Sequence, residues 1–177
     1  DPNKIWGGTQ DNGTNRTTGS TTWQHMVDGD GGQTRIDPTN PNILYHTFYY
    51  ARNLSGFIRR STDGGNTWTP ITNGINLSDN GMFYPPYILD PSNSSRLLLG
   101  TDKVYESTNQ GTTWTARSSV LGSFGSQVLA LAVAPNNSNV IYVTYTDGSV
   151  WVSTNNGQNW SRRDTGLPTG SAPPTGR

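Results

Sequence analysis

Short runs in which apolar and polar residues alternate, divided by turn residues, fill most of this chain. The clearest series lies near its end, where Val128–Ala134, Val140–Thr146, Ser149–Thr154 and Gln158–Arg163 are separated by Asn, Asp or Gly. Alternation with a period of two between turn residues is typical of β-strands, and no long segment has the 3.6-residue period of a helix. The pattern predicts an all-β protein built from four-stranded antiparallel meanders.

The same four-strand pattern extends back along the chain. It predicts two earlier sets of strands, at Pro86–Asp90, Arg96–Thr101, Lys103–Thr108 and Thr113–Ser118, and at Gln33–Asp37, Ile43–Tyr50, Gly56–Thr62 and Thr67–Thr72. A Pro-containing segment such as Asp37-Pro38 or Asp90-Pro91 precedes the second strand of each unit. It predicts a turn, because Pro fixes φ and the Asp side chain hydrogen-bonds to the backbone of the bend.

The first unit is incomplete. It starts at Lys4–Thr9, after Asp1-Pro2-Asn3, continues through a loose Gly- and Thr-rich stretch, and ends at Thr22–Val27. Trp23 stands near its end. The prediction is fifteen strands in four units, which cover about residues 1–31, 32–84, 85–127 and 128–170.

One octet recurs three times at a constant interval of 46 residues, at 61–68, 107–114 and 153–160. A period of this size is typical of propeller blades. Its Asp or Asn followed two residues later by Gly predicts a hairpin turn closed by side-chain hydrogen bonds, and its Trp predicts a ring buried between neighbouring sheets. We interpret the octets as structural clasps rather than active sites. Their key residues are Ser61, Asp63, Gly65, Trp68, Ser107, Asn109, Gly111, Trp114, Ser153, Asn155, Gly157 and Trp160.

The three octets resemble the Asp-box, or bacterial neuraminidase repeat, of sialidases, sortilin-type receptors and xyloglucan-hydrolysing glycosidases. The resemblance covers most of the chain, because the flanking strands recur with the octets. It implies a β-propeller and says little about activity. A sialidase resemblance would also imply an early Arg-Ile-Pro signature, and the nearest run here is Arg35-Ile36-Asp37. Sialidase activity is therefore disfavoured.

Composition excludes several classes of function. The 177 residues carry twelve basic and twelve acidic side chains, so the basic excess expected of a nucleic-acid or anionic-membrane partner is absent. With no cysteine, the chain has no disulfide, thiolate metal site or Cys nucleophile. It also has no apolar run long enough to span a bilayer. A polar surface rich in Asn, Thr and Ser, with only 14% charged residues, favours an extracellular or cell-surface bacterial protein.

Candidate acids lie on one face of the predicted fold. The octets and Pro turns share one face, and the turns between second and third strands and the connections between blades share the other, where propellers usually bind ligands. On this second face, Asp28 and Asp30 lie among glycines and could hold Ca²⁺ or supply one acid of a glycosidase. Asp11, before Gly13, could likewise be an acid. A tight structural turn accounts for all three without a function, and we predict no metal site.

Aromatic residues form the other candidate site. Phe83, Tyr84 and Tyr87 lie in a Pro-rich entry to an inner strand, where their rings would either stack on sugars or pack between blades. His25 and His46 are 21 residues apart without a metal-ligand spacing, which favours structural roles.

We predict a non-catalytic propeller segment that serves as a scaffold binding carbohydrate or a protein. Two alternatives remain. In the first, the chain is part of a xyloglucanase-like glycoside hydrolase, which requires paired Asp residues from opposite halves of a cleft. In the second, it is a surface or filament subunit whose open edges pair between copies. Four blades leave unpaired edges, so we expect further blades from the same or other chains. We interpret residues 166–177, rich in Pro and Gly, as a linker into the next blade.

Overall fold

The computed structural model describes residues 3–167, which form fifteen strands and no helix. The predicted Asp1-Pro2 turn and residues 168–177 of the predicted linker lie outside this range. The strands are β1 (Lys4–Thr9), β2 (Gly13–Thr18), β3 (Gln24–Val27), β4 (Thr34–Ile36), β5 (Leu44–Thr47), β6 (Ile58–Ser61), β7 (Thr69–Pro70), β8 (Tyr87–Asp90), β9 (Asn93–Gly100), β10 (Val104–Ser107), β11 (Thr115–Ala116), β12 (Val128–Ala134), β13 (Asn137–Tyr145), β14 (Val150–Ser153) and β15 (Ser161–Arg162).

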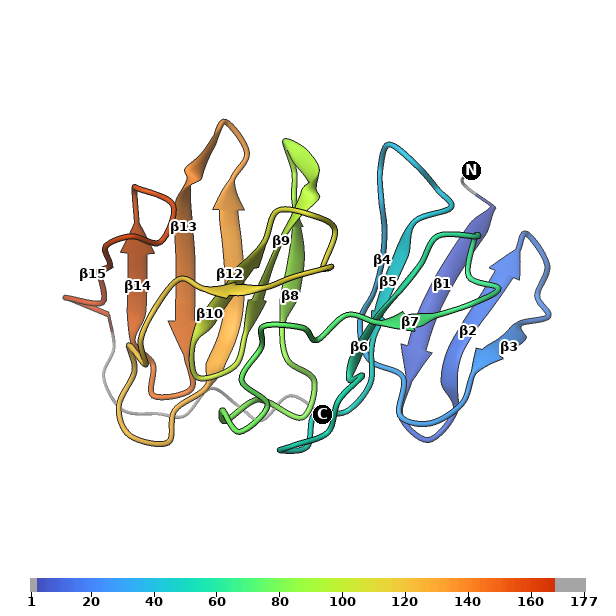
Figure 1. Cartoon of the computed structure of the whole chain (residues 1–177), viewed down its shortest axis with the longest axis horizontal. Helices are drawn as coiled ribbons and strands as arrows, with labels where there is room; N and C mark the ends of the chain where they lie inside the picture. Colours follow the sequence, from blue (N-terminus) through green and yellow to red (C-terminus); the bar gives the residue numbers. More distant parts are fainter. Residues whose placement is uncertain (1–2, 168–177) are drawn as a thin grey trace.

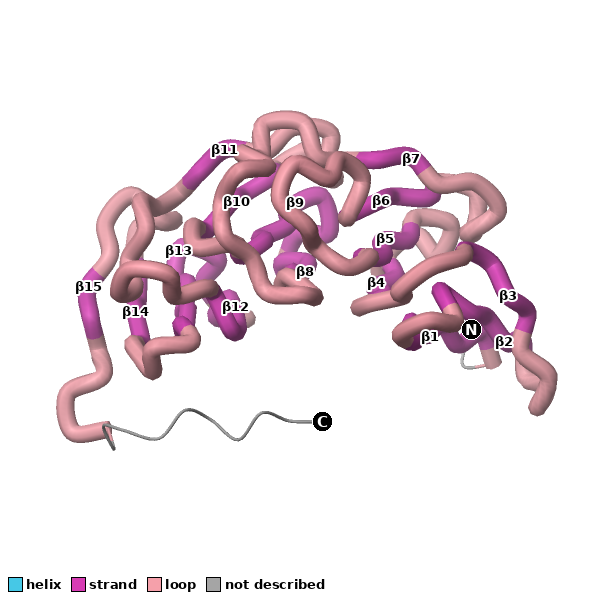
Figure 2. The backbone as a smooth tube through the Cα atoms, turned by 90° about the horizontal axis from the view of Figure 1, so that it is seen from below, coloured by secondary structure: helices cyan, strands magenta, loops and turns pink. Residues whose placement is uncertain are grey.

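These strands form four antiparallel sheets in chain order, one of three strands and three of four. The sheets stand side by side (Figure 1), and they follow an arc with the first strand of each sheet on the concave side and the last on the convex side (Figure 2). This arrangement is that of four neighbouring β-propeller blades. We call the sheets blade 1 (β1–β3), blade 2 (β4–β7), blade 3 (β8–β11) and blade 4 (β12–β15).

Blade 1 is more regular than the sequence pattern predicts. The Gly- and Thr-rich stretch predicted to be loose is strand β2, which pairs with β1 from Lys4↔Thr18 to Thr9↔Gly13. Its threonines suit a strand because β-branched side chains pack well on a pleated surface. The last strand of this blade starts at Gln24 rather than Thr22, and Trp23, 48% exposed, lies just before it.

The outermost strands of blades 2 to 4 are shorter than predicted. Each pairs through only two residues, as in Arg59↔Pro70 and Arg60↔Thr69. The octet that precedes each of these strands bonds to itself, so its residues stay in the turn instead of extending the ladder.

Two apolar clusters join the blades. One lies between blades 2 and 3 and includes Tyr45, Tyr87 and Leu99, and the other lies between blades 3 and 4 and includes Leu98 and Val143. Burial of these side chains supplies the main favourable free energy for stacking one sheet on the next.

The sheet faces at the two ends of the arc, on blades 1 and 4, lack such cover. Tyr45, Leu98 and Tyr142 occupy one register position in successive blades, opposite Arg60, Glu106 and Val152. Tyr45 and Leu98 are buried, whereas Tyr142 of blade 4 is 45% exposed. In blade 1, Ile5 is 51% exposed, although its counterparts Leu44, Leu97 and Ile141 are buried. Both ends of the arc therefore present an open apolar sheet face among the described residues.

Candidate functional site

The three octets share one pattern of internal hydrogen bonds. Ser61 Oγ accepts a hydrogen bond from Gly65 N at 2.8 Å and donates one to Asp63 Oδ1 at 2.8 Å. The corresponding distances are 2.8 and 2.9 Å around Ser107, and 2.8 and 3.0 Å around Ser153. The Thr67 hydroxyl that donates to Asp63 holds the pKa of this carboxyl well below its usual range. These polar groups are occupied within the turn, so the octets offer little to a ligand.

The octet Trp residues connect neighbouring blades. Trp114 Nε1 donates to Ile71 O at 2.7 Å and Trp160 Nε1 donates to Arg117 O at 2.9 Å, in each case just after the outer strand of the preceding blade. Trp68 differs, because its Nε1 donates to Gly65 O of its own turn at 3.1 Å. Its ring still reaches the preceding blade, where it packs edge-on against Trp6 with centroids 6.0 Å apart.

Each octet lies beside the turn between the first and second strands of its own blade. Gln110 N donates to Ser95 O and Asn156 N donates to Asn139 O, both at 2.9 Å. The octets therefore lie at one end of the strands. Blade 1 lacks the inner strand of the other blades, so its β1–β2 turn, which holds Asp11, corresponds to their turn between the second and third strands. This turn and the connection with Asp28 and Asp30 lie at the opposite end of the strands, which we call the inter-blade face.

On the inter-blade face, Asp11 and Asp30 come together although they are 19 residues apart. Asp11 N donates to Asp30 Oδ1 at 2.9 Å, and Gly31 N donates to Thr9 O at 3.0 Å. A Cβ on Gly31 would lie 2.1 Å from Gly13 O, so only glycine lets the connection lie directly on the turn. The sequence pattern marked both acids but gave no sign of this contact.

Tyr84 lies close to this acidic pair. Its hydroxyl is buried and has no hydrogen-bond partner among residues 3–167. Burial and the negative charges of Asp30 and Asp11 raise the pKa of Tyr84. The phenol therefore stays protonated at neutral pH, and the two carboxylates can accept hydrogen bonds from a ligand.

Asp28 has a different environment from Asp30. Its carboxylate is fully exposed and lies 2.7 Å from His25 Nε2. The two carboxylates thus contact different partners and do not converge on one point. Within residues 3–167, no three His, Asp or Glu side chains gather in a way that could hold a metal ion.

Two aromatic rings are partly exposed beside Tyr84. Phe83, 47% exposed, stacks on Tyr49, 38% exposed, with centroids 5.7 Å apart and an interplanar angle of 21°. Phe83 also contacts Tyr84 edge-on at 4.8 Å. Sequence reasoning missed Tyr49, although alternation along the strand ending near Tyr50 could have marked it as outward-facing. We call Asp11, Asp30, Tyr49, Phe83 and Tyr84 the acidic–aromatic site.

Tyr87 does not belong to this site, and its predicted role in ligand stacking needs correction. It is fully buried in β8, and its hydroxyl donates to Tyr45 O at 3.0 Å and to Gln33 O at 3.2 Å. Strand alternation explains the difference, since Tyr87 begins an inner strand and points into the junction of blades 2 and 3.

The two histidines also differ. His25 is exposed and pairs with Asp28, whereas His46 is fully buried between blades 1 and 2. The Thr14 hydroxyl lies 3.1 Å from His46 Nδ1, and the Trp68 ring packs edge-on against the imidazole at 4.3 Å. Burial, with the nearby charge of Arg59, lowers the pKa of His46 to about 3. His46 is therefore a neutral packing residue.

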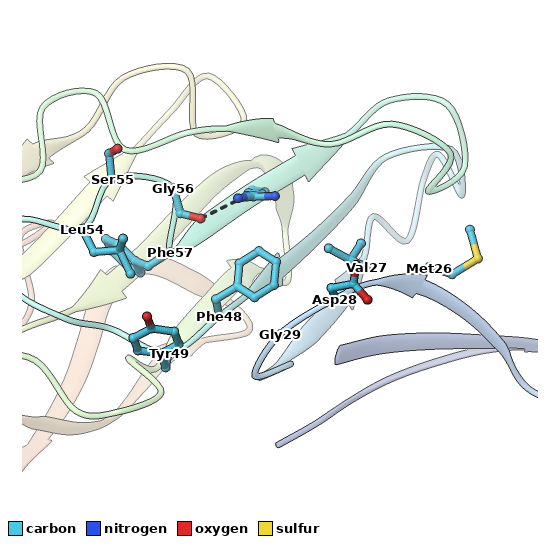
Figure 3. A pocket seen from close by; sticks show the side chains of 11 residues that line it. Met26, Val27, Asp28, Gly29, Phe48, Tyr49, Leu54, Ser55, Gly56 and Phe57 are labelled. Atoms are coloured by element: carbon cyan, nitrogen blue, oxygen red, sulfur yellow. Dashed lines mark hydrogen bonds between the residues drawn. The ribbon is translucent and has the colours of Figure 1, made fainter. Parts of the chain in front are cut away.

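A groove between blades 1 and 2 (Figure 3) shares Tyr49 with the acidic–aromatic site. Its volume is about 570 Å³, within the usual range of ligand pockets. In Figure 3, Phe48 lies between Val27 and Asp28 of blade 1 and Leu54 and Phe57 of blade 2.

Comparison with known proteins finds a sequence similarity to a xyloglucanase. The chain is 30% identical over 143 residues to a xyloglucanase of Hypocrea jecorina (strain QM6a), an alignment that covers 67% of this chain and 16% of the enzyme. The chain thus spans a small part of this relative's length. No family model matches the sequence.

Solved structures share the fold. An ancestral GH74 enzyme superimposes with a TM-score of 0.78 at 24% identity, covering 94% of this chain and 25% of the enzyme. The GH74 xyloglucanase of Xanthomonas campestris superimposes with a TM-score of 0.69 at 17% identity, covering 95% of this chain and 29% of the enzyme. At these identities the likeness shows the propeller fold alone.

Proposed function

We propose that this chain is a section of an extracellular, xyloglucanase-like glycoside hydrolase propeller with Asp-box turns, and that its acidic–aromatic site binds a β-linked glucan. The sequence similarity to the Hypocrea jecorina xyloglucanase carries the proposal. The composition, polar and low in charge, is consistent with a secreted bacterial protein.

The stacked pair of Tyr49 and Phe83 suits a sugar chain. Both rings are partly exposed and support each other, so a ligand meets a pre-formed aromatic surface. Asp30 and Asp11 next to Tyr84 add acceptors for sugar hydroxyls. One face of a pyranose ring is apolar and its rim is polar, which matches rings flanked by carboxylates.

Both acids of the site come from the same part of the fold, and so would lie on one side of a bound glycosidic bond. A glycosidase uses two carboxyl groups about 5–10 Å apart on either side of the bond. Asp11 and Asp30 both belong to blade 1 and its exit, and the Asp30 carboxylate accepts the Asp11 backbone N–H. This chain would therefore supply at most one acid, and the second would come from another part of the enzyme.

A non-catalytic scaffold is the second candidate. It is favoured by the same Asp11–Asp30 hydrogen bond, which holds one carboxylate in a structural role. In either case we expect the isolated chain to bind glucan without hydrolysing it. Release of reducing ends from xyloglucan by the purified chain alone would contradict this.

The open faces at Ile5 and Tyr142 suit further blades. Their counterparts in the interior of the arc are covered by neighbouring sheets, so a sheet of the same kind would fit each face. These blades would come from the same or another chain.

Affinity electrophoresis in a gel containing xyloglucan tests the proposal. We expect the chain to be retarded, and we expect Phe83→Ala and Tyr49→Ala each to weaken binding about three- to tenfold, because one ring contact is worth about 1 kcal/mol. Phe124→Ala is the control, because Phe124 is fully exposed and takes no part in the site. Absence of retardation, or equal effects of Phe83→Ala and Phe124→Ala, would contradict the proposal.

A further inference from the structure

The groove between blades 1 and 2 has its own chemistry. Its lining comes from the end of blade 1, with Met26, Val27, Asp28 and Gly29, and from blade 2, with Phe48, Tyr49, Arg59 and the loop Leu54–Phe57. Apolar side chains dominate this lining. Arg59 and Asp28 are its two charged residues.

Arg59 is held in a fixed orientation on the groove wall. Its guanidinium lies over the Phe48 ring, 4.6 Å from the centroid, and its Nε donates to Gly56 O at 3.2 Å. Within residues 3–167, its two Nη atoms have no hydrogen-bond or ion-pair partner. A guanidinium held in this way presents two parallel donors, the arrangement that binds a carboxylate with two hydrogen bonds.

Two other arginines at the blade junctions already have partners in the next blade. Arg60, the next residue of β6, donates through Nη1 to Gln110 O of blade 3 at 2.7 Å. Arg16 of β2 donates to Gly64 O of blade 2 at 3.4 Å. Both bind octet carbonyls and hold blades together. Arg59 points to the opposite face of the sheet and has no such partner.

The negative charge of the groove is that of Asp28, which has a partner in His25. Asp28 lies at the rim, where its exposed carboxylate contacts His25 Nε2. Arg59 faces neutral, apolar neighbours and the buried His46, which is uncharged above pH of about 3. Arg59 therefore forms no ion pair within residues 3–167, and Asp28 is the other charged residue of the groove lining.

We infer that this groove binds a carboxylate-bearing sugar, such as a uronic acid unit of a polysaccharide, with the carboxylate on Arg59 Nη1 and Nη2. The apolar face of the sugar would lie against Tyr49 and Leu54, and its hydroxyls would reach Ser55 and Asp28. A small inorganic anion would leave these apolar walls exposed, which is why a sugar acid fits better. The site goes beyond the proposed function, because its ligand is charged and a neutral glucan does not require Arg59.

Calorimetry with two probes tests the inference. The probes are an oligogalacturonate and a neutral xyloglucan oligosaccharide of similar length. We expect wild type to bind the oligogalacturonate, and Arg59→Gln to lose tenfold or more of this affinity while keeping its affinity for the neutral probe. Phe83→Ala should weaken binding of the neutral probe more than that of the oligogalacturonate. The control Arg162→Gln, which removes an exposed guanidinium paired with Asp164, should change neither affinity.

Ser55→Tyr is a second variant that fills the groove without touching the Arg59–Phe48 contact, and it should also abolish binding of the oligogalacturonate. The inference is overturned if wild type does not bind the oligogalacturonate. It is also overturned if folded Arg59→Gln or Ser55→Tyr binds this probe as wild type does. Loss of neutral binding alone would refute the proposed function and leave this inference standing.

Discussion

Arg96 Nε lies 2.5 Å from Glu106 Oε1, with both side chains buried where blade 3 meets blade 4. The same guanidinium reaches Asp90 at 2.5 Å within blade 3 and Asn156 Oδ1 at 2.5 Å in blade 4. Asn156 is the counterpart of Gln110 and Gly64, whose carbonyls accept hydrogen bonds from Arg60 and Arg16. Each junction among the described blades therefore has an arginine that binds the octet of the next blade.

Removal of Arg96 should destabilise the fold strongly. Arg96→Met leaves Asp90 and Glu106 buried, and we expect a loss of about 3–5 kcal/mol in the free energy of unfolding. Arg117 still contacts Glu106 and would limit the loss. Urea denaturation followed by Trp fluorescence measures the change. Arg162→Met, which breaks an exposed pair with Asp164, should cost less than about 1 kcal/mol. Similar losses in both variants would contradict the structure.

The octet serines should be stabilising at each of their three positions. Ser107→Ala leaves the Gly111 N–H without its acceptor, and we expect a loss of about 1–3 kcal/mol. Ser61→Ala and Ser153→Ala should behave alike, because the same bond recurs at 2.8 Å. Ser119→Ala, at an exposed position, is the control. A neutral effect of Ser107→Ala in urea denaturation would show that the octet does not act as a clasp.

His46 should make the stability of the fold depend on pH. Its folded pKa of about 3 is below its ordinary value of 6.5, so the unfolded chain binds the proton more readily. The contribution of neutral His46 is fully present above pH 6.5 and is lost as the pH falls toward 3, at up to about 1.4 kcal/mol per pH unit. Urea denaturation at several pH values, with His46→Leu as reference, measures it. A difference between the two proteins that is constant from pH 7 to 4 would contradict this.

The open face of blade 4 gives a matched pair of substitutions. Leu98→Lys places a charge in the buried junction of blades 3 and 4 and should lower the free energy of unfolding by several kcal/mol. Tyr142→Lys at the equivalent register should change it by about 0.5 kcal/mol or less.

Sedimentation velocity tests whether the open face of blade 4 pairs with another copy. If copies pair through their open faces, as in a filament subunit, wild type will exceed the 19.2 kDa of one chain and Tyr142→Lys will restore that mass.

The sequence predicted the fold well because local chemistry repeats. Each octet carries its own turn, so the period of 46 residues and the short strands around it follow from residues such as Ser107 and Trp114. The β2 strand is part of the predicted count of fifteen, but its bounds were not identified because it has Thr instead of large apolar residues and its blade has no octet. Tyr87 was grouped with Phe83 and Tyr84 as a possible stacking ring although the predicted strand Pro86–Asp90 includes it, because the sequence does not show which face of an inner strand meets the neighbouring blade.

The site was less predictable than the fold. Asp11 and Asp30 could be identified as candidate acids, but their contact depends on how the Gly-rich connection lies against the β1–β2 turn. The Tyr49–Phe83 stack joins residues from two separate loops, and the free donors of Arg59 result from its contact with Phe48. Such relationships come from tertiary packing and leave no local pattern in the sequence.

The most direct test of the whole account is a ¹H–¹⁵N NMR titration of the chain with a xyloglucan oligosaccharide. We expect shift changes at the amides of Asp11, Asp30, Tyr49, Phe83 and Tyr84, while the indole N–H signals of the octet residues Trp68, Trp114 and Trp160 stay in place. Shifts confined to the octet indoles, or no shifts at saturating oligosaccharide, would contradict a glucan-binding inter-blade face with structural octets opposite it.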